Sequence, residues 1–107
     1  MFFIGQKGAF ILITGKIAGV VFEITSLKEL VDFMKAHIAD YMGLEAEYLE
    51  LTDTFVNLGF EEDLLRECVY SIELDNIDVN EIDSRIKVTN KLGKLVKLIA
   101  RDTGIED

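Results

Sequence analysis

The sequence predicts a mainly α-helical protein, a four-helix bundle with a short third helix and an N-terminal apolar extension that can form a β-hairpin. Three observations predict this fold. Apolar residues recur at helical spacing after residue 26, the chain lacks proline, and half of its 107 residues are apolar, which is enough for one hydrophobic core. We expect an N-terminal extension over residues 1–25 and one helical domain over residues 26–107.

The N-terminal segment is apolar and rich in β-branched residues and glycine. We expect strands at Phe10–Ile13 and Val20–Ile24, joined by a turn at Thr14-Gly15-Lys16, although apolar runs this short also fit a buried helix. The longest uncharged run, from Gly8 to Gly15, is far shorter than a membrane span. We therefore expect neither a membrane anchor nor a signal peptide.

A first helix is predicted from Ser26 to Gly43. Ser26 stands three residues before Glu29, which is the spacing of a capping box, and Gly43 stands where a left-handed residue would end a helix. The apolar residues between them recur every three or four positions and predict one buried stripe: Leu27, Leu30, Val31, Met34, Ile38, Tyr41 and Met42.

The remaining elements follow in order. Residues 44–60 lack a regular period and predict a long packed loop. The acids at 61–63 favour the start of a second helix, which we expect to run to about Asp75. A short turn around Asn80–Ser84 predicts the third helix, and Thr89 is placed to cap a last helix that stops near Gly104.

Negative charge is concentrated in the middle of the chain. Residues 45–83 carry thirteen acids and a single base, Arg66, whereas residues 1–44 are neutral and residues 84–107 carry a net +3 within a total of −9. This balance argues against nucleic-acid binding, which needs clustered Lys and Arg. It favours a basic partner protein, although a merely solvated acidic face is the simpler alternative.

No set of residues in the sequence predicts catalysis or metal binding. The lone cysteine, Cys68, excludes an intramolecular disulfide and fits a reducing, cytoplasmic location. Its position on the predicted inner face of the second helix indicates a packing role, as does the position of His37, the only histidine, on the first helix. We expect a protein that is not an enzyme and holds no metal.

The loop before the second helix carries a recognisable phrase. Residues 53–59 read Asp-Thr-Phe-Val-Asn-Leu-Gly, and Ile86-Lys87-Val88-Thr89 precedes the last helix. With the order of the elements, these phrases resemble the acyl carrier protein family over about residues 26–101, with one spacing change. The resemblance implies that the long loop packs against an acyl-carrier-like helical bundle.

The residue that carries the family's cofactor differs in this chain. Family members attach 4′-phosphopantetheine to a serine just after the Leu-Gly pair, where this sequence has Glu62, or Asp63 with a one-residue shift. A carboxylate cannot form that serine phosphodiester. The nearest serine, Ser71, lies more than two helical turns further on, so we expect no bound cofactor.

We therefore expect an acyl-carrier-like interaction module whose acidic second helix docks on a basic surface of a synthase or acyltransferase, with no nucleic-acid or membrane partner. The resemblance implies a contact set of five acids with two apolar anchors: Glu61, Glu62, Asp63, Glu67, Glu73, Phe60 and Leu65. One alternative is a working carrier of fatty-acid or polyketide metabolism, modified with 4′-phosphopantetheine at a non-standard hydroxyl. Another is an oligomerising scaffold that associates through residues 2–24.

Overall fold

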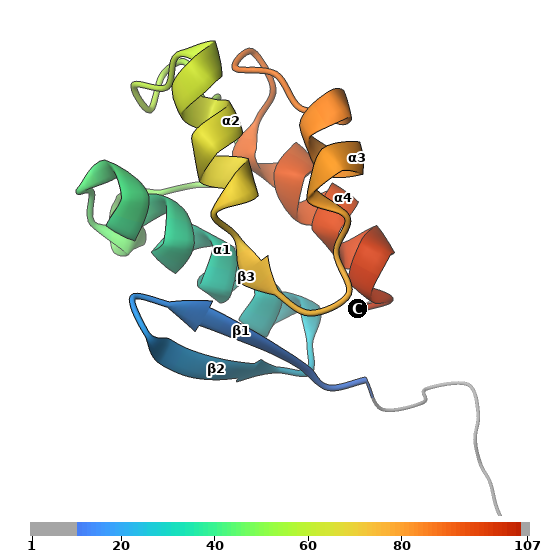
Figure 1. Cartoon of the computed structure of the whole chain (residues 1–107). Helices are drawn as coiled ribbons and strands as arrows, with labels where there is room; N and C mark the ends of the chain where they lie inside the picture. Colours follow the sequence, from blue (N-terminus) through green and yellow to red (C-terminus); the bar gives the residue numbers. More distant parts are fainter. Residues whose placement is uncertain (1–10, 106–107) are drawn as a thin grey trace, which may run out of the picture.

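Within residues 11–105, which the computed structural model describes, a three-stranded antiparallel sheet lies beside four α-helices (Figure 1). The sheet order is β2-β1-β3. In chain order the elements are β1 (Ile13–Ile17), β2 (Val20–Ile24), α1 (Leu27–Met42), the 3₁₀-helix η1 (Ala46–Tyr48), α2 (Glu62–Tyr70), β3 (Glu73–Leu74), α3 (Val79–Arg85) and α4 (Leu92–Thr103).

The predicted fold class, a mainly α four-helix bundle, is wrong, because the protein is an α+β fold. Strand β1 lies between β2 and β3, so the N-terminal hairpin pairs with the segment that follows α2. Helix α2 ends at Tyr70, five residues before the expected end at Asp75. The two-residue strand β3 is too short to give an alternating pattern, and its pairing with β1 is a contact between segments distant in sequence.

The hairpin forms with a different turn from the one expected. Val20–Ile24 is a strand as predicted, but the first strand is Ile13–Ile17 rather than Phe10–Ile13, whose first residue lies outside the described range. The turn is Ala18-Gly19, where φ is 51° and 83°. Two positive φ angles match the type of two-residue turn that suits the twist of paired strands. The expected turn at residues 14–16 is instead part of β1.

Gly15 lies at the closest approach between the sheet and α1. A Cβ built on Gly15 would stand 2.6 Å from the Phe33 Cζ atom and 2.8 Å from a methyl carbon of Leu74. Phe33 is buried and also packs edge-on against Phe22 of β2, with ring centroids 5.6 Å apart. The glycine is therefore needed for close packing inside a strand and not for a turn.

Helix α1 confirms the predicted first helix. The Ser26 hydroxyl accepts a hydrogen bond from the Glu29 amide (3.1 Å), and Gly43 ends the helix with φ 70°. The Glu29 carboxylate accepts from the Thr25 amide (2.7 Å), one residue earlier than in a standard capping box. Leu30, Met34 and Ile38 of the predicted stripe are fully buried, whereas the other members are only half-buried.

The long loop is fixed by backbone hydrogen bonds to the segment before α4. The amides of Phe55 and Val56 donate to the carbonyls of Asn90 (3.0 Å) and Val88 (2.8 Å), and the Leu92 amide donates to Asp53 (2.8 Å). This pairing occupies residues 88–91, so α4 begins at Leu92 and the expected cap at Thr89 is wrong.

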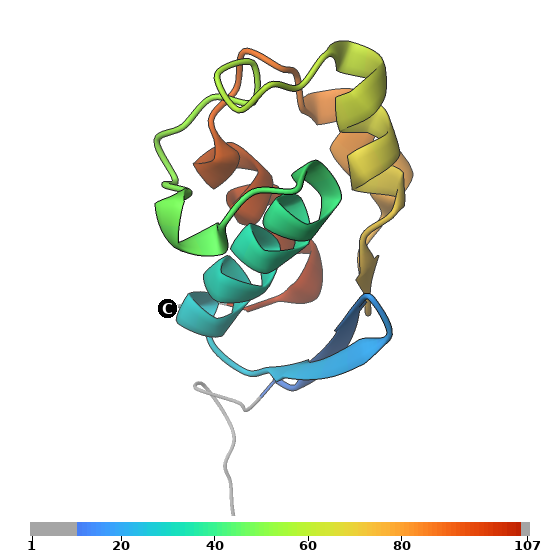
Figure 2. The same cartoon turned by 90° about the vertical axis from the view of Figure 1, so that its left-hand side faces the viewer.

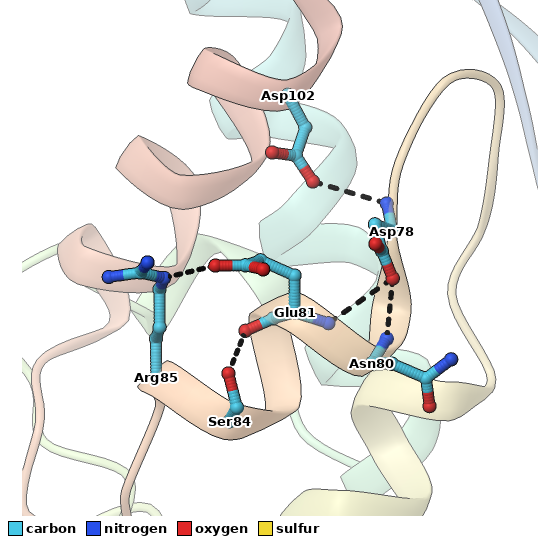
Figure 3. Close-up of polar contacts among 6 residues, drawn as sticks. All are labelled: Asp78, Asn80, Glu81, Ser84, Arg85 and Asp102. Carbon is cyan, nitrogen blue, oxygen red and sulfur yellow. Dashed lines mark hydrogen bonds and ion pairs between the residues drawn. The ribbon is translucent and has the colours of Figure 1, made fainter.

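The short third helix, α3, is confirmed near the predicted position and is joined to α4 (Figure 3). The Asp78 carboxylate caps it by accepting from the amides of Asn80 (3.1 Å) and Glu81 (3.2 Å). The Asp102 carboxylate on α4 accepts from the Asp78 amide (3.1 Å), and Glu81 pairs with Arg85 (2.6 Å). Three carboxylates, those of Asp78, Glu81 and Asp102, are thus engaged within the fold.

Replacing Gly15 with alanine should lower the free energy of unfolding by roughly 1–3 kcal/mol, because the added methyl group overlaps the Phe33 ring. Chemical denaturation would measure the loss. The neighbouring Lys16→Ala variant, at an exposed position of the same strand, should change stability by less than about 0.5 kcal/mol. Combining Gly15→Ala with Phe33→Leu should recover part of the loss, whereas strictly additive losses would contradict the predicted overlap.

Candidate functional site

The thirteen acids of residues 45–83 differ in their surroundings. Glu81 and Asp83 form ion pairs with Arg85 and Arg66. Four more carboxylates accept hydrogen bonds that hold the fold: Asp53, Glu67, Asp75 and Asp78. Seven have neither an ion pair nor a side-chain hydrogen bond among residues 11–105: Glu45, Glu47, Glu50, Glu61, Glu62, Asp63 and Glu73.

Three of these seven are consecutive, at the N-terminus of α2. Glu61 is the residue before the first helical turn and makes no capping hydrogen bond with its side chain, and Glu62 and Asp63 lie in that turn. All three are exposed. The positive end of the helix dipole favours negative charge at this position. This run is the most concentrated unpaired charge in the acidic block.

The two predicted apolar anchors are not accessible. Phe60 is 2% exposed and packs edge-on against Phe55, with ring centroids 5.5 Å apart, and Leu65 is 3% exposed. Both belong to the hydrophobic core. Both side chains position the start of α2 from inside, and of the two only Leu65 reaches a surface recess, the hollow beside Glu62.

The other predicted contact residues are separated along α2 and β3. The Glu67 carboxylate accepts a hydrogen bond from the Tyr41 hydroxyl (3.0 Å), which ties α2 to α1. Glu73 is in β3, at the far end of α2, where it pairs in register with Lys16 of β1. The structure therefore brings Glu61, Glu62 and Asp63 together and does not bring Glu73 to them.

A small open hollow of about 240 Å³ lies beside this run, between α2 and α3. Its walls include Glu62, the Arg66–Asp83 ion pair (3.5 Å) and Val88. The Val56 amide donates to the Val88 carbonyl (2.8 Å), and the Val56 side chain is 52% exposed. Val56 is thus an exposed apolar residue whose backbone is bonded to a lining residue of the hollow, and sequence reasoning missed it. It stands inside the Asp53–Gly59 phrase, but nothing local distinguishes it from the buried Phe55.

Cys68 and His37 lie in the core, as predicted. Cys68 is fully buried, and burial raises the pKa of its thiol to about 12, which keeps it protonated near neutral pH. His37 is 6% exposed, with its Nε2 atom 3.1 Å from the Cys68 carbonyl oxygen. Ser71, at the C-terminal end of α2, donates from its hydroxyl to the same carbonyl (2.7 Å). His37 and Ser71 thus both contact the Cys68 carbonyl, His37 from the core and Ser71 from an exposed position.

Residues 11–105 contain no cluster of three or more His, Cys, Asp or Glu side chains that could hold a metal ion. In the same range, no helix has both the length and the apolar character needed to cross a membrane.

The expected oligomer interface over residues 2–24 falls partly outside the described range. Within residues 11–24, β1 is paired on both sides and β2 has an open edge, with Val20 and Val21 each 56% exposed. Oligomerisation through this edge remains a prediction.

Comparisons of this chain with protein-family models, with curated proteins and with solved structures find no match.

The buried imidazole predicts a pH dependence of stability. Burial lowers the pKa of His37 below the ordinary value of 6.5, although the Cys68 carbonyl, Asp40 and Glu73 oppose this. The unfolded chain therefore takes up a proton near pH 6.5 that the folded chain resists, so the free energy of unfolding should fall as pH drops below about 7, by at most about 1.4 kcal/mol per pH unit.

Urea unfolding between about pH 7.5 and 5.5 would measure this slope. The His37→Gln variant should be less stable at neutral pH but should lose the slope in this range. An equal slope in the variant would show that other groups cause it.

Proposed function

We propose that this chain is a non-catalytic interaction module that docks on a basic surface of a partner protein through the N-terminus of α2. The proposal rests on the run of Glu61, Glu62 and Asp63, which are exposed and have no ion-pair or hydrogen-bond partner among the described residues. Charges of this kind steer association over a distance and select a partner of opposite charge.

The neighbouring residues support a contact rather than a merely solvated face. The hollow between α2 and α3 gives the partner a recess beside Glu62, and the exposed Val56 is bonded through its amide to Val88, which lines that hollow. A centre of apolar contact within a charged rim is the usual anatomy of a protein interface. Phe60 is buried away from this surface, and Leu65, although it lines the hollow, is only 3% exposed.

The sequence resemblance to acyl carrier proteins suggests which partner to test, namely a synthase or an acyltransferase with a basic surface patch. It also raises the carrier alternative. Glu62 and Asp63 occupy the first turn of α2, and both are carboxylates, so the family's serine ester cannot form at either position. Ser71 is at the opposite end of α2, with its hydroxyl engaged by the Cys68 carbonyl. We therefore propose docking without a covalent cofactor.

Neutralising the acidic run should weaken docking. As a probe of a basic partner surface we suggest a labelled amphipathic helix with lysines on its polar face. The Glu61→Gln/Glu62→Gln/Asp63→Asn variant should bind it at least about tenfold more weakly, because three steering charges are lost. Fluorescence anisotropy would give the dissociation constants at about 0.05 M and 0.5 M salt, where screening should weaken the wild type.

A matched control removes the same charge elsewhere in the acidic block. Glu45→Gln/Glu47→Gln/Glu50→Gln also neutralises three acids without side-chain partners in the described residues, but in the loop around η1. This variant should bind within about threefold of the wild type. Equal losses in the two variants would mean that net charge alone attracts the probe, and the docking proposal would fail.

Incubation with a phosphopantetheinyl transferase and coenzyme A should leave the intact mass of this chain unchanged, since a carboxylate replaces the serine at the expected position. An acyl carrier protein that has its serine, present in the same reaction, provides the positive control. A mass gain that the Ser71→Ala variant abolishes would instead establish the carrier alternative.

A further inference from the structure

A second recess lies between α1 and α4, apart from the acidic run. This groove has a volume of about 790 Å³ and shares no lining residue with the hollow beside Glu62. In Figure 2, α2 lies to the right of α1, whereas α4 lies behind α1. Its apolar lining comes from α1, the long loop and α4: Leu27, Val31, Leu51, Val96 and Leu98.

The groove is apolar because of how α1 and the loop meet α4. Leu30 and Met34 of α1 are buried in the core. Leu27 and Val31 lie beside them on the helix surface and are only half-buried. The Gly93 amide donates to the Leu51 carbonyl (2.9 Å), and this bond holds the loop against the first turn of α4. Leu51 remains 38% exposed beside it.

Positive charges line the same groove. They lie at intervals of three, three and four residues along α4 and the residue before it: Lys91, Lys94, Lys97 and Arg101. All four are exposed, and none is in an ion pair with a residue of the described range. Their ten-residue span corresponds to about 15 Å along the helix axis.

We propose that this groove binds an acidic amphipathic helix of a partner protein. A helix of about three turns presents apolar residues at i, i+3, i+4 and i+7, and such rows fit apolar grooves between helices. Acids beside that row would meet cations spaced along about 15 Å of α4. This surface is distinct from the acidic run of α2. It selects an acidic partner, whereas the acidic run selects a basic one.

Other ligands match these features less well. A fatty acid carries one negative charge, which would leave most of the cations unused. Nucleic acid offers charge but no apolar row for Leu27, Val31 and Leu98. A second copy of this chain is disfavoured because its acidic helix, α2, buries Leu65, Cys68 and Val69 and so cannot present an apolar row.

The test uses a labelled synthetic helix of about 15 residues, with leucines at i, i+3, i+4 and i+7 and glutamates beside them. Its glutamine counterpart keeps the apolar row without the charge. We expect the acidic helix to bind and the glutamine helix to bind at least about tenfold more weakly. Absence of measurable binding by the acidic helix would overturn the proposal.

Variants of the protein locate the site. Lys94→Glu/Lys97→Glu should weaken binding of the acidic helix at least about tenfold, and Lys94→Gln/Lys97→Gln should weaken it less. The control Lys16→Glu/Lys87→Glu makes the same charge change outside the groove and should stay within about threefold. Equal losses in the two charge-reversal variants would overturn the proposal.

The apolar lining is tested separately by Val31→Asp, which should also weaken binding, by about fivefold or more. Circular dichroism confirms that each variant is folded. Sedimentation of the wild-type protein alone tests whether a second copy of this chain fills the groove. A dimer that Lys94→Glu/Lys97→Glu disrupts would overturn the helix proposal in favour of self-association.

Discussion

The close approach of α1 to β1 at Gly15 determines how the two parts of this protein fit together. The Phe33 ring occupies the space that any side chain at position 15 would need, and Leu74 of β3 meets the same point from the other edge of the sheet. Because β1 pairs with both β2 and β3, this one contact links the hairpin, α1 and the end of α2. The position of α2 therefore depends on a glycine almost fifty residues before it.

This arrangement explains why some acids are available to a partner and others are not. The C-terminal end of α2 is held by β3, with Asp75 bonded to the Thr14 backbone, and its middle is held by the Glu67–Tyr41 contact. Its N-terminal end is positioned by the packing of Phe60 against Phe55 in the core. Fixing the helix in this way leaves the carboxylates of residues 61–63 exposed at one end.

The net charge of −9 hides a division between two faces. Three of the seven acids without partners lie together at the start of α2, whereas the cations of α4 line an apolar groove beside α1. Within residues 11–105, no ion pair joins the acids of residues 61–63 to the cations of α4. The hollow beside Glu62 and the groove beside α4 share no lining residue, so we propose that the two faces act on different partners.

Local patterns in the sequence were sufficient where residues close together in the chain determine the structure. Ser26, Glu29 and Gly43 predicted the ends of α1, because capping depends on residues within one turn. The same logic failed at Thr89, whose neighbours pair with the backbone of the distant loop. It also failed at Gly15, where the reason for a glycine is the Phe33 ring and not a turn.

The candidate surfaces were predictable only in part. Leu65 lies three and four residues before the buried Cys68 and Val69, so its spacing already indicated the buried face of α2. The burial of Phe60 depends on Phe55 and could not be inferred from helical spacing. The cations of α4 also show a readable spacing, but the apolar residues opposite them belong to α1 and the loop, and only the tertiary structure places them together.

The most direct measurement of the two-faced charge arrangement is an amide NMR titration of the isotope-labelled protein. A basic helix should shift residues around 56–67, and an acidic helix should shift residues around 27–31 and 91–101. Titrated separately, each helix should shift its own set of residues and leave the other set unchanged. Overlapping sets of shifts would contradict the existence of two independent docking faces.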